Sequence, residues 1–345
     1  MPNVGILGFA HGHVNKYCQR WNDDPSMGVR VVAGWDHDSD RAAKAAEQHG
    51  VELAESPGAV VERDDVEAVV VAAETSMHAD LAETAADAGV GTILQKPMAL
   101  TLDEADRIVD AADSAGVPFT MAWQMRVDPM NLKMKELIES GVLGRVFMVR
   151  RRHGLSMHKN PSFFGSWHVK PELNRDIFAD DASHAADFVL WLLGMPNTVT
   201  AELGSLSDPR MPNDHAIAIY RYADGRFAEV VNSFACVAGE NTTEIVGEDG
   251  VVIQNCGDGP STNIPRPPGA IGLKWFLHET GEWTISDLPI PNSQGDRIAG
   301  LARPLAEFLA GDRPPIATAR EGRDALRLIL ACYESAEQGR RVELV

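Results

Sequence analysis

Short apolar runs alternate with helical patterns through the first 120 residues, and this alternation is the strongest constraint on the fold. The runs at 4–7, 29–34 and 66–72 are predominantly apolar, which is typical of strands buried on both faces of a sheet. The segments at 13–21 and 40–48, which lie between them, have the spacing of helices. Strands and helices that alternate in this way predict βαβ units and a parallel sheet.

The same alternation continues to Trp123. A helical pattern at 78–88 is followed by a strand at 92–94, a helix at 101–112 and a strand at 119–123. Residues up to Trp123 are therefore expected to form one α/β domain.

The rhythm changes after Trp123, so the rest of the chain, 124–345, is expected to form a second α/β domain. A strand pattern at 145–152 is followed, after a loop and a helix, by five more, at 198–203, 216–222, 227–234, 243–246 and 251–254. Consecutive strands of this kind predict a sheet that is antiparallel or mixed. Helices are expected at 128–139, 181–193, 298–309 and 322–338, and a long loop at 257–270.

The charge of the chain limits its partners. Lysine and arginine number 31 and aspartate and glutamate 50, which gives a formal net charge of −19. Because nucleic acids and anionic membranes bind basic surfaces, we expect neither as a partner. The four cysteines form no CxxC pair, and the chain shows neither a signal-peptide pattern nor an apolar run of about 18 residues. These features favour a soluble cytoplasmic protein.

The turn after the first predicted strand stands where a dinucleotide-binding fold carries the pattern G-x-G-x-x-G. Gly8 fits the tight turn, whereas Ala10 and His13 occupy the positions of the second and third glycines. The alternative is an ordinary turn between a strand and a helix. The turn nevertheless precedes a helix whose N-terminus can bind phosphate. We assign to a cofactor site the residues Gly8, Phe9, Ala10, His11 and His13.

Asp36 follows the second predicted strand. A carboxylate at that place can accept hydrogen bonds from the ribose hydroxyls of NAD, and it repels the 2′-phosphate of NADP. The alternative is an acidic residue at the start of a helix. The position at the end of a strand favours the ribose role, so we expect NAD rather than NADP.

Two further patterns suit proton transfer. Gln95-Lys96-Pro97 ends a predicted parallel strand, where a lysine can donate to a substrate hydroxyl and stabilise an alkoxide. Asp180 and His184 are four residues apart on one predicted helix and so share a face. An imidazole titrates near neutral pH, and a neighbouring carboxylate stabilises its cation. Taken singly, the two patterns would be interpreted as a solvated Lys-Pro loop and as a capped helix with a structural histidine.

Together these patterns resemble those of the Gfo/Idh/MocA family of nicotinamide-dependent oxidoreductases, over almost the whole chain. Gln95-Lys96-Pro97 resembles the family's Glu-Lys-Pro motif, and Asp180 and His184 match its Asp-x-x-x-His pair, with Asp187 three residues later. Five segments are similar to the family's domain-crossing and C-terminal parts: 126–129, 139–144, 321–323, 333–336 and 339–342.

The resemblance implies a Rossmann dinucleotide-binding domain at 1–123. It also implies a C-terminal α/β domain at 124–345 with an open, predominantly antiparallel sheet, and a final helix that packs back toward the first domain. It implies that Lys96, Asp180 and His184 are catalytic, with His184 as the acid/base. The implied reaction is hydride transfer between NAD and a secondary alcohol or ketone of a sugar, cyclitol or related polyol. The implied assembly is a homodimer or homotetramer.

Other side chains are assigned to the site from their places in the chain. Thr75 and His78 precede the lysine motif, and we assign them with Lys96 to the cofactor. Four further residues join Lys96, Asp180 and His184 as substrate contacts: Trp123, Arg126, Trp167 and His168. Arg126 could instead pair with a carboxylate. Because the spacing of the histidines and aspartates at 153, 158, 168, 180, 181 and 184 is irregular, we expect no metal site.

Two other functions stay open. One is a redox-neutral, NAD-dependent glycosidase-type enzyme, and the other is a non-catalytic protein that binds NAD or a sugar. Gln95 and the segment Asn174-Arg175-Asp176 replace the family's usual glutamate and glycine run, which permits a binding protein. The presence of Lys96, Asp180 and His184 favours catalysis.

Overall fold

The computed structural model describes residues 2–237, 241–254 and 268–344. The chain divides into two compact units, each with its own sheet. The first unit comprises Met1–Val127, Glu172–Asn174 and Arg297–Leu326. The second unit comprises Asp128–Pro171, Arg175–Asp296 and Arg327–Val345.

The sheet of the first unit has six parallel strands in the order β3-β2-β1-β4-β5-β6. They are β1 (Asn3–Leu7), β2 (Arg30–Trp35), β3 (Glu52–Leu53), β4 (Ala68–Val71), β5 (Gly91–Leu94) and β6 (Phe119–Met121). Every residue of β4 and β5 is buried, as continuous apolar runs predict. The strand order is that of a Rossmann fold and confirms the predicted parallel sheet. Only β3 was not predicted, because two residues show no periodicity.

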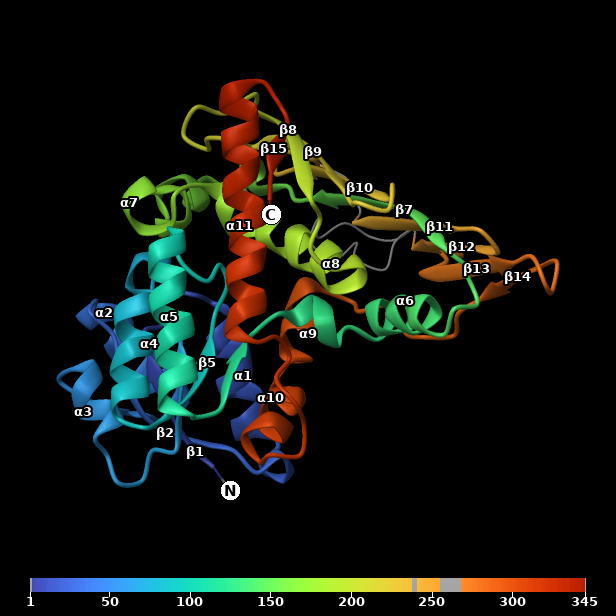
Figure 1. Cartoon of the computed structure of the whole chain (residues 1–345). Helices are drawn as coiled ribbons and strands as arrows, with labels where there is room; N and C mark the ends of the chain where they lie inside the picture. The colour runs from blue at the N-terminus through green and yellow to red at the C-terminus, as the bar shows by residue number, and fades with distance from the viewer. Residues whose placement is uncertain (1, 238–240, 255–267, 345) are drawn as a thin grey trace. The chain divides into compact units, whose positions relative to one another are not determined.

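Helices cover both faces of this sheet (Figure 1). They are α1 (His13–Asp23), α2 (Ser39–His49), α3 (Pro57–Val61), α4 (His78–Asp87), α5 (Leu102–Ala115) and α10 (Ala302–Leu309). α1 contacts α2 and α10, whereas α4 contacts α3 and α5. The helix expected at 298–309 is in fact two helices, since α9 (Gln294–Ala299) precedes α10.

The sheet of the second unit has nine strands in the order β14-β13-β12-β11-β7-β10-β9-β8-β15. They are β7 (Val146–Gly154), β8 (Thr198–Gly204), β9 (His215–Arg221), β10 (Phe227–Ser233), β11 (Thr242–Gly247), β12 (Gly250–Gln254), β13 (Leu273–Leu277), β14 (Glu282–Ile285) and β15 (Val342–Glu343). Among the strands in the described part of the chain, only β7 and β10 of this sheet pair in parallel, which confirms the predominantly antiparallel sheet. The hairpin of β13 and β14 was not predicted.

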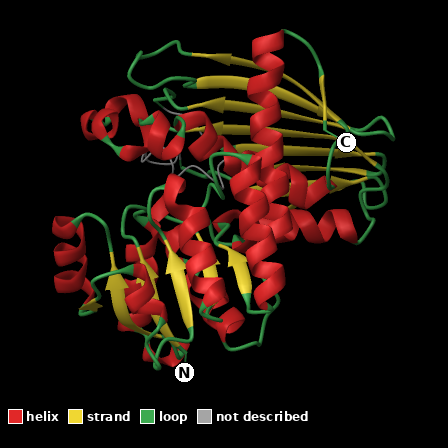
Figure 2. Ribbon diagram, turned by 60° about the vertical axis from the view of Figure 1, so that its left-hand side comes forward, coloured by secondary structure: helices red, strands yellow, loops and turns green. Residues whose placement is uncertain are grey.

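Helices pack on one face of this sheet: α6 (Pro129–Glu139), α8 (Ser183–Leu193) and the end of α11 (Ala319–Gln338) (Figure 2). The Arg151 guanidinium of β7 lies 4.9 Å from the Phe188 ring of α8. The Tyr220 hydroxyl of β9 lies 3.3 Å from the Cys332 sulfur of α11. The start of α11, as far as Leu326, belongs to the first unit. The α11 helix therefore contributes to both units.

The segment between β7 and α8 contains short helical turns where the sequence predicts a loop. They are η4 (Met157–Lys159), η5 (Pro161–Gly165), η6 (Trp167–Val169) and α7 (Pro171–Asn174). A π-helical turn, η7 (Phe178–Ala182), then leads directly into α8. Most of the loop expected at 257–270 lies outside the described residues.

Candidate active site

The turn after β1 lies where β1 adjoins β4 and the strand order of the sheet reverses, which is where open α/β sheets bind ligands. Gly8 has φ +88°, and a Cβ atom there would lie 2.4 Å from the Cα of Ala73. The backbone N–H of His11 donates to the carbonyl of Ala72 at 2.9 Å. The turn is therefore packed against the residues that follow β4, and only glycine fits at position 8.

The turn leads into α1, whose first residue is His13. The N-cap residue Gly12 has no side chain that could cap the helix, whereas side chains cap α2, α3 and α5, namely those of Asp38, Ser56 and Thr101. His11 is 3% exposed, and its ring meets the His13 ring edge-on with centroids 4.3 Å apart. The start of α1 thus has no side-chain cap, and helix starts of this kind are common binding places for anionic groups.

Asp36 follows β2, and its side chain is fully buried. Its Oδ2 accepts the backbone N–H of Phe9 at 2.6 Å, and its Oδ1 accepts that of Asp38 at 2.9 Å. Arg41 donates from Nε to Oδ2 at 2.7 Å and from Nη2 to Oδ1 at 2.8 Å. This carboxylate therefore ties the turn after β1 to the end of β2.

These features fit a dinucleotide. The glycine turn lies at the reversal point, the start of α1 has no side-chain cap, and a carboxylate stands at the end of β2. Most of the residues assigned to the cofactor from the sequence lie at this edge of the sheet: Gly8, Phe9, Ala10, His11, His13 and Asp36. Their individual contacts with NAD stay predictions.

Thr75 and His78 follow β4 and are buried. The Thr75 hydroxyl donates to Asn174 Oδ1 at 2.5 Å. The Nδ1 atom of His78 lies 3.0 Å from the carbonyl of Pro97, and its Nε2 lies 3.2 Å from that of Ala73. Burial lowers the pKa of His78, which favours the neutral ring. His78 therefore joins the residues that follow β4 and β5, whereas Thr75 holds Asn174.

Lys96 follows β5, is 3% exposed and forms a cis peptide bond with Pro97. The side chain of Gln95 is buried beside it and donates from Nε2 to the Tyr17 hydroxyl at 2.7 Å. The Oε1 of Gln95 has no hydrogen-bond partner among the described residues. Because Gln95 is an amide, it adds no negative charge next to Lys96.

Trp123 and Arg126 lie at the end of the first unit and are buried. Arg126 donates from Nη1 to Glu321 Oε1 at 2.5 Å. Burial raises the pKa of Glu321, but the charge of Arg126 and the hydrogen bonds from Thr318 and Arg126 together outweigh it, so that the pKa is lowered overall. Arg126 thus has the carboxylate partner that was the alternative to a substrate contact, and its role toward a substrate stays a prediction.

Asp180 and His184 lie where the π-helical turn η7 meets α8, and both are buried. Asp181, in the same turn, brings Oδ1 to 3.8 Å from Nε2 of His184. Its Oδ2 lies 2.7 Å from Nε2 of His153 on β7. Since a carboxylate only accepts, Nε2 of His153 carries the proton of that hydrogen bond. Asp181 therefore links two histidines, and π turns of this kind are frequent at functional sites.

The start of the π turn is held by Asp176. Its carboxylate accepts from the Tyr333 hydroxyl at 2.5 Å, from Asn213 Nδ2 at 2.7 Å and from the Ala179 N–H at 3.0 Å. Burial raises the pKa of Asp176, although these donors oppose the rise. The preceding residue, Arg175, has φ +69° and places its guanidinium 5.0 Å from the Tyr333 ring centre.

Trp167 and His168 form an aromatic stack in the second unit. Their ring centroids lie 4.0 Å apart with an interplanar angle of 26°, and the Phe163 ring lies 5.5 Å from that of His168. Ser166 Oγ lies 3.2 Å from Nδ1 of His168, which helps to fix the imidazole. Apolar ring faces of this kind suit the C–H faces of a sugar, so the assignment to substrate stays a prediction with a physical basis.

The sequence interpretation considers His153 and Asp181 only as metal ligands and gives no role to Asp176, Arg41 or Glu74. Nothing in the sequence pairs His153 with Asp181, because the two residues are 28 positions apart.

Among the described residues, no group of three His, Cys, Asp or Glu side chains could hold a metal ion. In the same part of the chain, no helix has the length and apolar character needed to cross a membrane.

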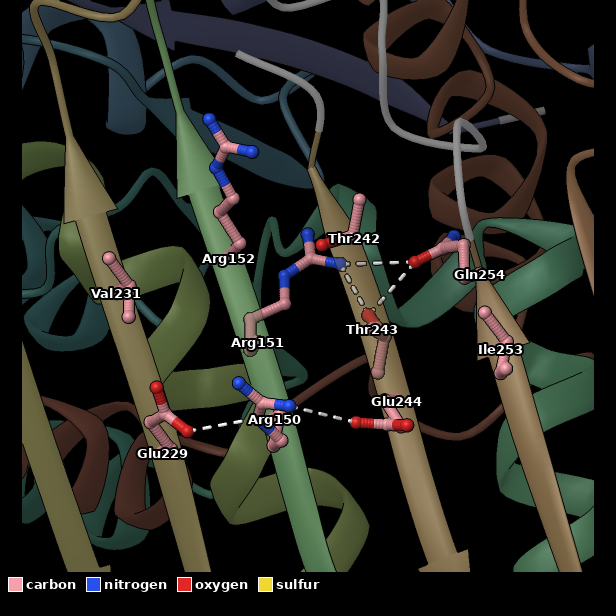
Figure 3. Close-up of a pocket in the computed structure, with 10 residues that line it drawn as sticks. All are labelled: Arg150, Arg151, Arg152, Glu229, Val231, Thr242, Thr243, Glu244, Ile253 and Gln254. Carbon is pink, nitrogen blue, oxygen red and sulfur yellow. Dashed lines mark hydrogen bonds and ion pairs between the residues drawn. The ribbon is translucent and has the colours of Figure 1, made fainter. Parts of the chain in front are cut away.

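A cavity of about 350 Å³ lies elsewhere, at β7, β10, β11 and β12 (Figure 3). Arg150 reaches Glu229 at 3.0 Å and Glu244 at 3.2 Å across the strands. Arg151 is buried and donates to Thr243 Oγ1 at 2.8 Å. The residues that line this cavity include none of those assigned to catalysis, and Arg150 is already paired with Glu229 and Glu244. We therefore do not place the reaction there.

The fold and the site define a dinucleotide-binding α/β protein with a second, sheet-forming unit. Residues 2–123 match the family description "Oxidoreductase family, NAD-binding Rossmann fold", and residues 131–253 match "GFO/IDH/MocA C-terminal domain". The chain therefore belongs to the Gfo/Idh/MocA family of oxidoreductases. These matches confirm the predicted family, the oxidoreductase class and NAD as the cofactor.

Similar proteins cover nearly the whole chain. The D-apiose dehydrogenase of Paraburkholderia graminis is 27% identical over 99% of this chain and 88% of that protein. The myo-inositol 2-dehydrogenase of Thermotoga maritima is 24% identical over 99% and 98%. A crystal structure of an oxidoreductase from Agrobacterium radiobacter, in complex with NAD+, L-tartaric acid and magnesium, matches with a TM-score of 0.84 at 22% identity, over 99% and 98% of the two chains.

Proposed function

We propose that this protein is a dehydrogenase that transfers a hydride between NAD and a secondary alcohol or ketone of a sugar, cyclitol or related polyol. The observation that carries the proposal is that the half-buried carboxylate of Asp181, before α8, lies between two buried histidines, His153 of β7 and His184 of α8, in a member of an NAD-binding oxidoreductase family. Two relatives that align over nearly the whole chain are named as dehydrogenases of D-apiose and of myo-inositol, which supports a polyhydroxylated substrate.

His184 is the proposed acid/base. NAD, when bound, supplies the hydride acceptor. As the hydride leaves the carbinol carbon, the hydroxyl proton passes to the imidazole of His184, and the reverse reaction returns it. Asp181 lies 3.8 Å from that imidazole and stabilises its cation, while His153 fixes the orientation of the carboxylate.

The other assignments complete the proposed mechanism. Lys96 donates a hydrogen bond to the reacting oxygen and stabilises negative charge on it, and Asp180 positions the substrate. The proposed substrate contacts also include Trp123, Arg126, Trp167 and His168. The proposed cofactor contacts are Gly8, Phe9, Ala10, His11, His13, Asp36, Thr75, His78 and Lys96.

The test is a panel of sugars and cyclitols with NAD and NADP side by side, read as the absorbance of reduced nicotinamide. We expect NADH formation with at least one polyol. His184→Asn should lower kcat by at least about a thousandfold while the Kd for NADH changes less than about threefold, in line with the loss of a general base. His278→Asn, which alters an exposed histidine in the turn after β13, is the matched control and should keep its activity.

Three results would contradict the proposal. An unchanged rate in His184→Asn would remove the assigned base. Cleavage of a glycoside with bound NAD and without net NADH would show the redox-neutral reaction instead. Binding of NADH without turnover of any polyol would indicate a binding protein.

We propose in addition that the chain forms a homodimer or homotetramer through the open face of the nine-stranded sheet. Large apolar side chains are exposed on the strands of this sheet: Ile217, Ile219, Phe227, Trp283 and Ile285. Such a face favours burial against another copy. The double variant Ile217→Glu with Ile219→Glu should lower the mass measured by light scattering to that of a smaller species, and an unchanged mass would argue against this interface.

A cytoplasmic location is also proposed. The free thiols of Cys18, Cys236 and Cys332 support a reducing compartment.

A further inference from the structure

Four side chains form a polar network at the ends of β2 and β4. Arg41 lies between Asp36 and Glu74, with Nη2 at 3.0 Å from Oε1 of Glu74 and 3.2 Å from Oε2. His37 Nε2 lies 2.9 Å from Oε2 of Glu74. The Asp36 side chain is fully buried and that of Glu74 is 4% exposed, whereas that of Arg41 is 25% exposed. The His37 side chain is 44% exposed, so Arg41 is the most exposed of the three charged side chains and His37 lies closer to solvent.

The carboxylate of Asp36 is already saturated. It accepts from two backbone groups, the N–H of Phe9 and the N–H of Asp38, and twice from Arg41. A carboxylate offers about four lone-pair positions, so no position is left for a ribose diol. The backbone donors belong to packed turns, but the donors of Arg41 lie on a flexible side chain. Arg41 is thus the group that a ribose diol can replace.

Glu74 can hold the guanidinium of Arg41 after a ribose has displaced it from Asp36. Leaving the charge of a partly buried arginine without a carboxylate partner costs much free energy. Glu74 is within hydrogen-bond distance of Arg41 before any displacement, so the ion pair with Glu74 can persist when the pair with Asp36 is broken. The three charged groups together carry one net negative charge when His37 is neutral, and this charge opposes a phosphate.

We propose that Glu74 is a specificity-determining residue for the cofactor. It retains Arg41 when the ribose diol of NAD takes the place of Arg41 on Asp36, and so withholds the guanidinium from the 2′-phosphate of NADP. The inference rests on the NAD-binding role of the first unit, which the family match supports, and is independent of the substrate proposed above. Asp36 alone repels the phosphate, but without Glu74 an arginine at this place would attract it.

The test measures equilibrium binding of NADH and NADPH to the purified protein without any substrate, by titration calorimetry. Glu74→Gln keeps the shape of the side chain and removes its charge. We expect the Kd for NADPH to fall roughly tenfold or more, because Arg41 becomes available for charge-assisted hydrogen bonds to the phosphate. The Kd for NADH should change by less than about threefold. Glu74→Asp, which keeps the charge, should preserve the selectivity of the wild-type protein.

A double variant tests whether the change in NADPH affinity depends on Arg41, and a second variant serves as a control. In the double variant Arg41→Met with Glu74→Gln, the gain in NADPH affinity should disappear. Glu83→Gln is the matched control, because Glu83 pairs with Arg107 on the exposed surface of the same unit. It should leave both Kd values unchanged.

Any of three outcomes overturns the inference: an unchanged NADPH-to-NADH ratio in Glu74→Gln, a gain that persists without Arg41, or an equal gain in Glu83→Gln. Thermal unfolding of each variant separates a specific loss of binding from a loss of folding. Because no substrate is present, a failure to oxidise polyols refutes the proposed dehydrogenase activity and leaves these binding ratios interpretable.

Discussion

Replacement of Gly8 by alanine is the sharpest test of the geometry at the turn after β1. Gly8 has φ +88°, a backbone conformation that residues other than glycine rarely adopt. A Cβ there would lie 2.4 Å from the Cα and 2.5 Å from the backbone nitrogen of Ala73. Because both atoms belong to the backbone, the overlap cannot be relieved by rotation of a side chain. The turn or the segment after β4 has to move.

The expected destabilisation follows from three contributions. An alanine in the left-handed region costs roughly 1–2 kcal/mol. Overpacking against backbone atoms costs about 1–3 kcal/mol. The lower entropy of the unfolded chain offsets about 0.4–1 kcal/mol. The free energy of unfolding of the first unit should therefore fall by about 1–5 kcal/mol, which corresponds to a Tm lower by about 2–20 °C for a domain of this size.

The assay is thermal and urea unfolding of Gly8→Ala, together with titration of NADH. Gly12→Ala is the matched control in the same turn, since Gly12 has φ −58° and no atom within 4 Å of an added Cβ. Its stability should change by less than about 1 kcal/mol. We expect Gly8→Ala to bind NADH more weakly than Gly12→Ala. If the two variants are equally stable and bind NADH equally well, the close approach at Gly8 does not control this turn.

Three other predictions follow from the same structure. His153→Gln removes the 2.7 Å partner of Asp181, so the pH profile of kcat should shift while the Kd for NADH is unchanged; an unshifted profile would place His153 outside the proton pathway. Burial lowers the pKa of His78 below 6.5, so the folded state binds this proton less tightly than the unfolded state. The contribution of His78 to stability should be full above about pH 6.5 and should fall below it, by up to about 1.4 kcal/mol per pH unit, until the pKa of the folded state is reached. Urea unfolding of His78→Gln at several pH values should show a smaller slope. Asp176→Ala leaves the Tyr333 hydroxyl and the Asn213 amide without their acceptor and should cost about 1–3 kcal/mol, whereas Asp208→Ala, at an exposed ion pair, should leave the Tm nearly unchanged.

Part of the site could be predicted because its residues are neighbours along the chain. Asp180 and His184 lie in the consecutive helical segments η7 and α8, and Lys96 follows a strand, so local sequence patterns could place each of them on its element. The π-helical turn before α8 was not predicted, since its extra residue breaks the i, i+4 spacing without altering the composition. The carboxylate that lies near His184 is that of Asp181, three residues before it, and not the predicted Asp180 partner alone.

The residues that the sequence interpretation missed share one property. Arg41 and Glu74 are 33 positions apart, His153 and Asp181 are 28 apart, and Asp176 and Tyr333 are 157 apart. Each pair joins different elements, and a local pattern carries no information about which distant side chain will face it. The chain has 50 acidic residues, so charge and residue type alone could not identify which of them pairs with a given arginine, histidine or tyrosine.

The sequence by itself determined the alternation of strands and helices, the change to consecutive strands after Trp123, and the side chains able to move a proton. The physical reason is that apolar periodicity and turn residues act over a few positions. Only the tertiary structure decided which charges meet: the saturation of Asp36 by Arg41, the nearby Glu74, and the carboxylate between His153 and His184. Those contacts depend on the strand order and on the packing of whole sheets, which bring together residues that are distant in the chain.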